Sequence, residues 1–379
     1  MIAKRAQHLK PFLVMEILEK AHQMEEQGMD VIHLEVGEPD FKTPQIIKNS
    51  VLEALEEGFT RYTSSLGDLR LREAICKYYQ KVYKVKISPE QIIVTSGTSP
   101  ALLLIFLALL EKGEEVIISD PHYACYPNFI ELAGGQVVRI PVFEEDGFQY
   151  RPEEIKKKIS SKTKAILINS PSNPTGHLLS ATRIKQIASL KPYLISDEIY
   201  HGLVYKGQEH SALEFTKQAF VLNGFSKLYA MTGLRLGYLI APQEFIRPLQ
   251  KIQQNLFISA NSVMQKAAIT ALEKTGPEIL NMKKLYNQRR LYMIKRLREL
   301  GFKIKKEPQG AFYVFVKAKH LSNNSYDLAF DILDKVQVGV TPGIDFGQNG
   351  EGYLRFSYAN SMGNIKEGLD RLEKYLARK

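Results

Sequence analysis

The chain has 379 residues, of which 44% are hydrophobic and 24% are charged, which is the composition of a folded globular protein and excludes a disordered or fibrous one. The formal net charge is +10, but the Lys and Arg residues are scattered and accompany no helix-turn-helix, zinc-finger or RNA-binding motif, so we expect no nucleic-acid partner. The length exceeds that of one ordinary core and predicts a large domain with a smaller one.

The first 28 residues have apolar side chains at helical spacing, mixed with acids, and no continuous apolar core of an export signal. The only two cysteines, Cys76 and Cys125, lie far apart without a CxxC or His-rich spacing, so we expect no disulfide framework and no bound metal. A reducing, cytoplasmic location fits this usage. The most apolar run, residues 101–110, is about half of the ~20 residues that a membrane span needs and predicts a buried helix, not an anchor.

Between about residues 91 and 241, short apolar runs recur, separated by helical segments. Most are near-continuous Val, Ile and Leu, as in strands that are covered on both faces. The runs are QIIVTSG, EVIISDP, QVVRIPV, AILINSPSNPTG, YLISDEIY, AFVLNGFSK and LRLGYLIA. They predict an α/β domain with a mostly parallel, seven-stranded sheet.

Polar residues, tyrosines and a glycine stand at the ends of these runs. They are Ser96-Gly97-Thr98, Asp120 to Tyr123, Asn173, Asp197, Tyr200 and Lys227. In open α/β sheets, ligands bind beyond the carboxyl ends of the strands, so a Lys, an Asp, an Asn and two Tyr on one rim predict a site there.

Gly97 and Thr98 end one run and open a helix, where backbone N–H groups and a close backbone approach can bind a phosphate. Ordinary helix capping is the alternative interpretation. Arg235 could add a bidentate guanidinium to the same phosphate, or could form a surface ion pair instead.

A phosphate near a lysine at a strand end suggests pyridoxal phosphate, whose aldehyde reacts with a lysine amine. Asp197 could then hold the pyridine nitrogen protonated, with helix capping as the alternative. Asn173 and Tyr200 could hydrogen-bond the 3′ oxygen of the cofactor, and Tyr123 could stack on its ring. An Asn-Pro turn without function is the alternative interpretation of Asn173, and core packing is the alternative for Tyr123.

From about residue 262 the pattern is helical, broken near Gly276-Pro277, and then residues 302–318 and 350–359 read as strands. The second domain is therefore expected to be α+β, with the N-terminal helix packed against it. We place a large cofactor domain at residues 46–279 and a small domain at residues 1–45 and 280–379.

SGTSPAL, DPHYACYP, NSPSNPTG, SDEIYHGLVY, SKLYAMTGLRLGY and GYLRFSYA follow one another in this order along the chain. In order and spacing they resemble the class I aminotransferases of the fold-type I pyridoxal-phosphate-dependent enzymes, the superfamily of aspartate aminotransferase. The resemblance runs from LEVGEPDF, near residue 34, to the C-terminal strand.

The resemblance implies that Lys227 carries pyridoxal 5′-phosphate as a Schiff base, with Asp197 on the pyridine nitrogen and Tyr200 on the 3′ oxygen. Further residues that it assigns to the cofactor are Asn173, also on the 3′ oxygen, Tyr123 on the ring, and Gly97, Thr98, Ser226 and Arg235 on the phosphate. Arg355, Gly37 and Asn173 would bind the substrate, Arg355 by a planar fork on the α-carboxylate. Tyr62 would reach the cofactor phosphate of a neighbouring subunit, which implies a homodimer with shared active sites.

The implied reaction moves an amino group from an L-amino acid to a 2-oxo acid in ping-pong fashion, through pyridoxamine phosphate. A lyase reaction on the same scaffold is the nearest alternative, and a cofactor-binding regulator without turnover is a further one.

Two departures from the family's pattern stand out. Gly224, three residues before Lys227, occupies a position that is often serine in related enzymes. Ser99 and Pro100 stand where some aspartate-preferring relatives have a lysine, and Phe12 and Leu13 are apolar in a segment that often borders the substrate. Both departures argue against a strict preference for dicarboxylates.

Overall fold

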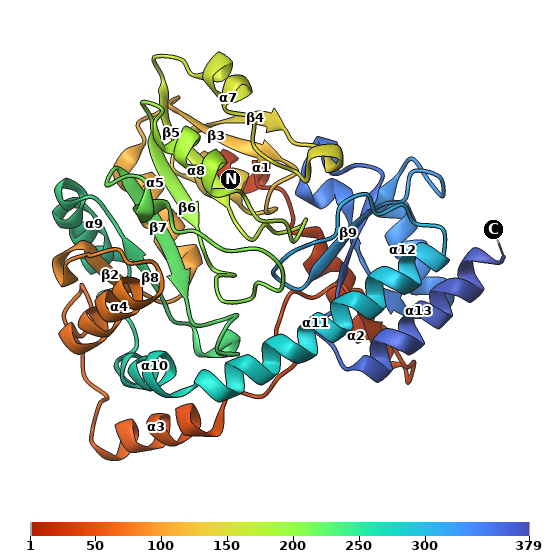
Figure 1. Cartoon of the computed structure of the whole chain (residues 1–379), viewed down its shortest axis with the longest axis horizontal. Helices are drawn as coiled ribbons and strands as arrows, with labels where there is room; N and C mark the ends of the chain where they lie inside the picture. Colours follow the sequence, from red (N-terminus) through yellow and green to blue (C-terminus); the bar gives the residue numbers. More distant parts are fainter. Residues whose placement is uncertain (1, 379) are drawn as a thin grey trace.

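The main sheet has seven strands in the order β2-β8-β7-β6-β5-β3-β4 in the computed structural model, which describes residues 2–378 (Figure 1). The strands are β2 Ile92–Thr95, β3 Glu115–Asp120, β4 Gln136–Pro141, β5 Thr163–Asn169, β6 Tyr193–Asp197, β7 Ala219–Gly224 and β8 Gly237–Ile240. All neighbours are parallel except the two pairs that β8 forms. Each strand coincides with one of the apolar runs, although β5 begins two residues before its run, and the predicted mostly parallel sheet is confirmed.

Helices cover the two faces of this sheet, which explains why its central strands β5, β6 and β7 are buried over most or all of their length. The surrounding helices are α3 Gln45–Glu56, α4 Leu69–Val82, α5 Thr98–Leu109, α6 Tyr126–Leu132, α7 Pro152–Lys158, α8 Ala181–Ala188 and α9 Gln243–Leu256. On one face, Leu102 and Phe106 of α5 join Ile130 of α6 and Leu249 of α9 in one buried cluster. The apolar run at residues 101–110 is thus a buried core helix, as predicted. None of the described helices combines the length and the apolar character that crossing a bilayer requires.

The C-terminal part is built around a second, smaller sheet in the order β11-β12-β9, all antiparallel. Its elements are α10 Ser262–Lys274, α11 Gly276–Glu299, β9 Tyr313–Lys317, α12 Ser325–Val336, β10 Val338–Gly339, β11 Thr341–Pro342, β12 Tyr353–Ser357 and α13 Met362–Leu376. The helical pattern breaks between α10 and α11, as Gly276-Pro277 predicted. Helix α11, cyan in Figure 1, runs from the side of the main sheet to these C-terminal elements.

The N-terminal segment lies against the C-terminal part. It contains α1 Lys4–His8, α2 Leu13–Glu26 and β1 Ile32–His33. Strand β1 pairs in parallel with β10, and α2 contacts α12 and β11 (Figure 1). The N-terminal helix therefore packs with the smaller sheet, and the domain boundaries given above stay a prediction.

One predicted strand is shorter than expected. The run at residues 302–318 forms a strand only over Tyr313–Lys317, and before it Lys303 makes a single bridge to Lys317. Pro308 has no N–H group to donate to a ladder. Gly310 packs its backbone closely against Pro171 and the Leu203 carbonyl oxygen, which takes this segment out of the sheet.

Candidate active site

A cavity of about 560 Å³ lies at the carboxyl ends of the parallel strands, between the main sheet, α2 and β12. The predicted site residues that line it are Gly37, Thr98, Tyr123, Asn173, Asp197, Tyr200, Ser226, Lys227, Arg235 and Arg355. They come from segments more than 300 positions apart in the sequence. The rim that the strand ends predicted is therefore one wall of a real cavity.

Asp197 ends β6 and is buried, with 5% of its surface exposed. Tyr126 Oη donates a hydrogen bond to its Oδ2 at 2.7 Å, and the Ile199 backbone N–H donates to its Oδ1 at 3.2 Å. Burial raises the pKa of the Asp197 carboxyl to about 6, because these two donors offset only part of the lost hydration. The carboxylate is thus poised for a cationic partner inside the cavity.

Lys227 follows β7 by three residues, and its Nζ donates a hydrogen bond to the Gly37 carbonyl oxygen at 2.7 Å. Loss of hydration is the main reason that the pKa of the Lys227 amine is lowered to about 8; Glu38 opposes this shift, and the charges of Arg355 and Arg235 contribute to it. A larger share of this amine is therefore neutral, and so nucleophilic or basic, near neutral pH than of an ordinary lysine.

Arg235 lies over the N-terminus of α5. A methyl group at Gly97 would lie only 2.8 Å from Arg235 Nη2, so the missing side chain of Gly97 makes room for the guanidinium. Arg235 itself adopts a left-handed conformation, with φ of +53°, and donates from Nη1 to the Thr232 carbonyl oxygen at 3.0 Å. A guanidinium, a helix N-terminus and the hydroxyls of Thr98 and Ser226 together form a site suited to a phosphate.

The backbone packing beside Arg235 explains why glycine stands at position 224. Gly224 pairs with Gly237 of β8, and a methyl group at Gly224 would lie 3.0 Å from the Gly237 Cα. Gly237 in turn packs against the Gly97 backbone, where an added methyl carbon would be 2.9 Å from the carbonyl carbon. Three glycines thus bring β7, β8 and the start of α5 together, and a side chain such as serine at Gly224 would force them apart.

Arg355 of β12 is 98% buried and forms the opposite side of the cavity. Its Nη1 donates to Asn173 Oδ1 at 2.9 Å, and its Nη2 donates to Thr341 Oγ1 at 3.0 Å and to the Glu35 carbonyl oxygen. The Nε atom of Arg355 is buried and has no hydrogen-bond partner within residues 2–378. A buried N–H group without a partner is rare, and here it leaves a donor for a ligand in the cavity.

Sequence reasoning missed two tyrosines that hold the predicted residues in place. Tyr126 donates to Asp197 and lies three residues after Tyr123, in the same motif. Tyr313 of β9 exchanges a hydrogen bond with Tyr200 at 2.9 Å between the hydroxyls, and its ring packs under the Arg355 guanidinium at 4.3 Å. The sequence around Tyr313 indicated only an aromatic residue in a strand, because the residues that Tyr313 contacts, Tyr200 and Arg355, lie in distant segments.

Helix α2 and its N-cap residue close the cavity with apolar side chains, those of Phe12, Val14, Met15 and Leu18. Asp345 fixes the start of this helix, because its carboxylate accepts hydrogen bonds from the backbone N–H groups of Leu13 and Val14 at 3.0 and 3.3 Å. This capping residue follows the helix by more than 300 positions, so no local pattern could predict it. Leu13 itself lies outside the cavity lining.

Two predicted residues do not line this cavity. Gly97 lies just behind it, beneath Arg235. Tyr62 is at the surface, with 80% of its side chain exposed, between α3 and α4.

Comparison with known proteins assigns the class of protein. The family model described as "Aminotransferase class I and II" matches residues 29–372. The chain therefore belongs to the class I and II aminotransferases, and the resemblance seen in the sequence is confirmed.

Individual relatives cover the whole chain. It is 44% identical over 380 residues to the (5-formylfuran-3-yl)methyl phosphate transaminase of Methanocaldococcus jannaschii, a match that covers 99% of this chain and 100% of the relative. It is 41% identical over 384 residues to the aspartate aminotransferase of Pyrococcus horikoshii, covering 99% of this chain and 97% of the relative. The solved structure of Thermus thermophilus aspartate aminotransferase with maleate matches with a TM-score of 0.95 at 33% identity, over 99% of both chains. This protein is an enzyme, an aminotransferase with the fold-type I architecture.

Proposed function

We propose that this aminotransferase moves an amino group from an L-amino acid to a 2-oxo acid, in ping-pong fashion, with pyridoxal 5′-phosphate bound covalently through Lys227. The observation that carries the proposal is one cavity that combines the amine of Lys227, the buried carboxylate of Asp197 and the unpartnered Nε of Arg355. Each group matches one requirement of the reaction: covalent attachment, charge balance at the ring and capture of a carboxylate.

The residues of the cavity fit this cofactor. Burial alone raises the pKa of Asp197, so a protonated pyridine nitrogen beside it would restore the carboxylate. The Arg235 guanidinium over the start of α5 suits the phosphate. When bound, pyridoxal phosphate supplies an electron sink for the bond broken at the substrate Cα and carries the amino group between the two half-reactions.

Lys227 has two roles in this proposal. Its lowered pKa, about 8, favours the neutral amine that binds the cofactor. Once the substrate amine has taken its place on the cofactor, the freed amine of Lys227 would be the base that removes the proton from the substrate Cα. Tyr200 and Asn173, which line the same cavity, are placed to hydrogen-bond the 3′ oxygen, and the ring of Tyr123 to stack on the cofactor.

Arg355 binds and orients the substrate α-carboxylate through Nε and one Nη, and Gly37 lines the same cavity. Its bonds to Asn173 and Thr341 fix the plane of the guanidinium. Orientation of the carboxylate sets which bond at Cα is aligned for cleavage. The apolar α2 wall favours donors with apolar side chains over dicarboxylic ones, because a second carboxylate would lose its hydration there.

The exposed ring of Tyr62 supports the further proposal of a homodimer with shared active sites, in which Tyr62 reaches the cofactor phosphate of the partner. Sedimentation should then give twice the chain mass of 43.1 kDa. Tyr62→Ala should weaken retention of the cofactor, whereas Tyr292→Ala, which removes a half-buried tyrosine of α11 outside the cavity lining, should not. A stable, fully active monomer would contradict this part of the proposal.

The first experiment is the visible absorption spectrum of the purified protein during titration with single L-amino acids. We expect a cofactor band that one group of amino acids bleaches and that 2-oxo acids restore, without release of ammonia. Lys227→Ala should lose the cofactor on gel filtration, whereas Lys206→Ala, at an exposed position, should retain it. Pyruvate and ammonia formed from amino acids without bleaching would replace the proposal by a lyase reaction, and no band after addition of pyridoxal phosphate would overturn the site.

A further inference from the structure

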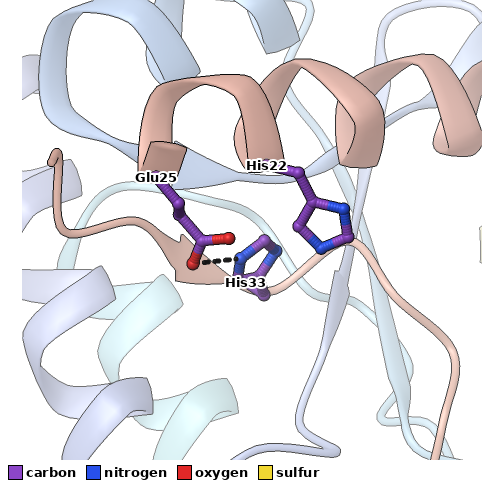
Figure 2. Close-up of side chains that lie close together, drawn as sticks. All are labelled: His22, Glu25 and His33. Carbon is purple, nitrogen blue, oxygen red and sulfur yellow. Dashed lines mark hydrogen bonds and ion pairs between the residues drawn. The ribbon is translucent and has the colours of Figure 1, made fainter. Parts of the chain in front are cut away.

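A cluster of two histidines and one glutamate lies outside the active-site cavity, on the far part of α2. His22 and Glu25 stand three positions apart on α2, and His33 lies opposite them on β1 (Figure 2). One ligand atom from each of the three side chains lies within 4.8 Å of the other two. His33 Nε2 and Glu25 Oε1 are 3.1 Å apart, and the two imidazole centroids are 5.8 Å apart.

A buried carboxylate fixes the orientation of His33. Glu35 is completely buried, and its Oε1 lies 2.6 Å from His33 Nδ1. With Nδ1 held in this way, the Nε2 atom of His33 faces Glu25 Oε1, and Figure 2 shows this contact as a dashed line. A carboxylate behind a histidine is the arrangement that orients histidine ligands in metal sites, where it fixes the tautomer and raises the basicity of the ring.

We propose that His22, Glu25 and His33 bind a divalent transition metal ion of the zinc type, with water completing the coordination. Two imidazole nitrogens and one carboxylate oxygen are a ligand set that suits Zn²⁺ and excludes Ca²⁺ and Mg²⁺, which require oxygen ligands.

The geometry requires little movement. Bonds of 2.0–2.1 Å in a tetrahedral site place neighbouring ligand atoms roughly 3.3 Å apart, and His33 and Glu25 already stand at 3.1 Å. His22 has to approach by roughly 1–2 Å, which a rotation of its side chain supplies because that side chain is exposed on the helix surface. Without a metal ion, His33 and Glu25 form an ion pair with each other.

A metal ion bound to this cluster would link two elements, α2 and β1, that both lead to the active-site cavity. Val14 and Leu18 of the same helix line the active-site cavity, and β1 leads within a few residues to Gly37, the hydrogen-bond partner of Lys227. A metal shared by α2 and β1 would tie the apolar wall of the cavity to the segment that carries Gly37.

The test is calorimetric titration of the full-length protein, loaded with pyridoxal phosphate, with ZnCl₂ in a buffer free of chelators. Wild type should bind one equivalent per chain, and His22→Gln should weaken this binding at least about tenfold, because it removes one ligand and leaves the His33–Glu25 and His33–Glu35 bonds in place. The control is His210→Gln, which removes a half-exposed histidine that pairs with Glu214 at 3.0 Å but belongs to no cluster of three such ligands among residues 2–378.

Zinc X-ray absorption of the one-equivalent complex should show two imidazoles and a light-atom ligand in wild type, and one imidazole fewer in His22→Gln. Zinc should also raise the thermal midpoint of wild type and of His210→Gln by the same amount, and that of His22→Gln by less, because a ligand that binds only the folded state stabilises it in proportion to its affinity. Equal zinc affinity in wild type and His22→Gln, or no stoichiometric binding by wild type, would overturn the proposal and leave the cluster as an ion pair only.

Discussion

The two walls of the active-site cavity differ in chemistry and in origin. The sheet wall carries charged and hydrogen-bonded groups, among them Asp197, the last residue of β6, and Lys227, three residues beyond β7. The α2 wall is apolar, built from Phe12, Val14, Met15 and Leu18, and it is held in place by Asp345 from the far end of the chain. The contrast indicates a division of tasks, in which the sheet wall sets the reaction and the helix wall selects the substrate.

The burial of the two walls supports this division. Asp197 is 5% exposed and has fixed hydrogen-bond partners, whereas on the helix wall Val14 is equally buried but Met15 is 43% exposed. Preorganised buried groups give large electrostatic effects on a reaction, while an apolar contact at a partly open wall changes binding by a few kcal/mol at most. Substitutions on the two walls should therefore differ in size and in kind.

The largest effect is expected at Asp197. Asp197→Asn keeps the shape of the side chain but removes the charge that would face the pyridine nitrogen, so kcat should fall about 10²–10³-fold for every amino donor. The matched control is Asp120→Asn, at another buried carboxylate that ends a strand but lies outside the cavity lining. Steady-state kinetics with several donors would contradict the division of tasks if Asp197→Asn impaired only some of them.

A somewhat smaller effect is expected at Arg355. Arg355→Lys keeps the charge but loses the planar fork, so kcat/KM should fall about 10²-fold, because a misplaced carboxylate misaligns the bond at Cα. Arg290→Lys is the control, since Arg290 is another buried arginine, 4% exposed, that binds the Pro308 carbonyl oxygen away from the cavity. A comparable loss of kcat/KM in both variants would point to general destabilisation instead.

The buried carboxyl of Asp197 also predicts a pH-dependent stability difference in the cofactor-free protein. Burial raises the pKa of Asp197 to about 6 from 3.8, so its favourable contribution is present at low pH and is lost as the pH rises through about 6. Relative to wild type, the free energy of unfolding of Asp197→Asn should therefore rise by about 2 kcal/mol between roughly pH 4 and pH 7.5. Urea denaturation at several pH values measures this difference, and a difference independent of pH would show that the carboxyl does not titrate in this range.

The smallest effect is expected on the helix wall. Met15→Ala should lower kcat/KM about tenfold for L-leucine or L-phenylalanine and change it little for L-alanine, because only large side chains reach the α2 wall. Met29→Ala is a closely matched control, since Met29 is 42% exposed and does not line the cavity. Equal losses with all three donors would show that α2 supports the site as a whole and does not select the substrate.

The sheet wall was largely predictable from the sequence, whereas the residues that hold it in place were not. Asp197 and Lys227 end apolar runs, and parallel strands bring such ends to one edge whatever the rest of the chain does. Tyr126 and Tyr313 were missed because their hydrogen bonds, to Asp197 and Tyr200, join segments that share no local pattern.

By itself the sequence determined the mostly parallel sheet, the break before α11 and the family, because these depend on local periodicity, on Gly-Pro pairs and on motifs that are contiguous in the chain. Only the tertiary structure decided the short length of β9, the cap of α2 by Asp345 and the meeting of His22, Glu25 and His33. We expected no metal because the cysteine spacing and the lack of a His-rich segment gave no sign of one, whereas this cluster needs a helix and a strand folded against each other. Contacts of this kind are set by packing between distant elements, which no local pattern records.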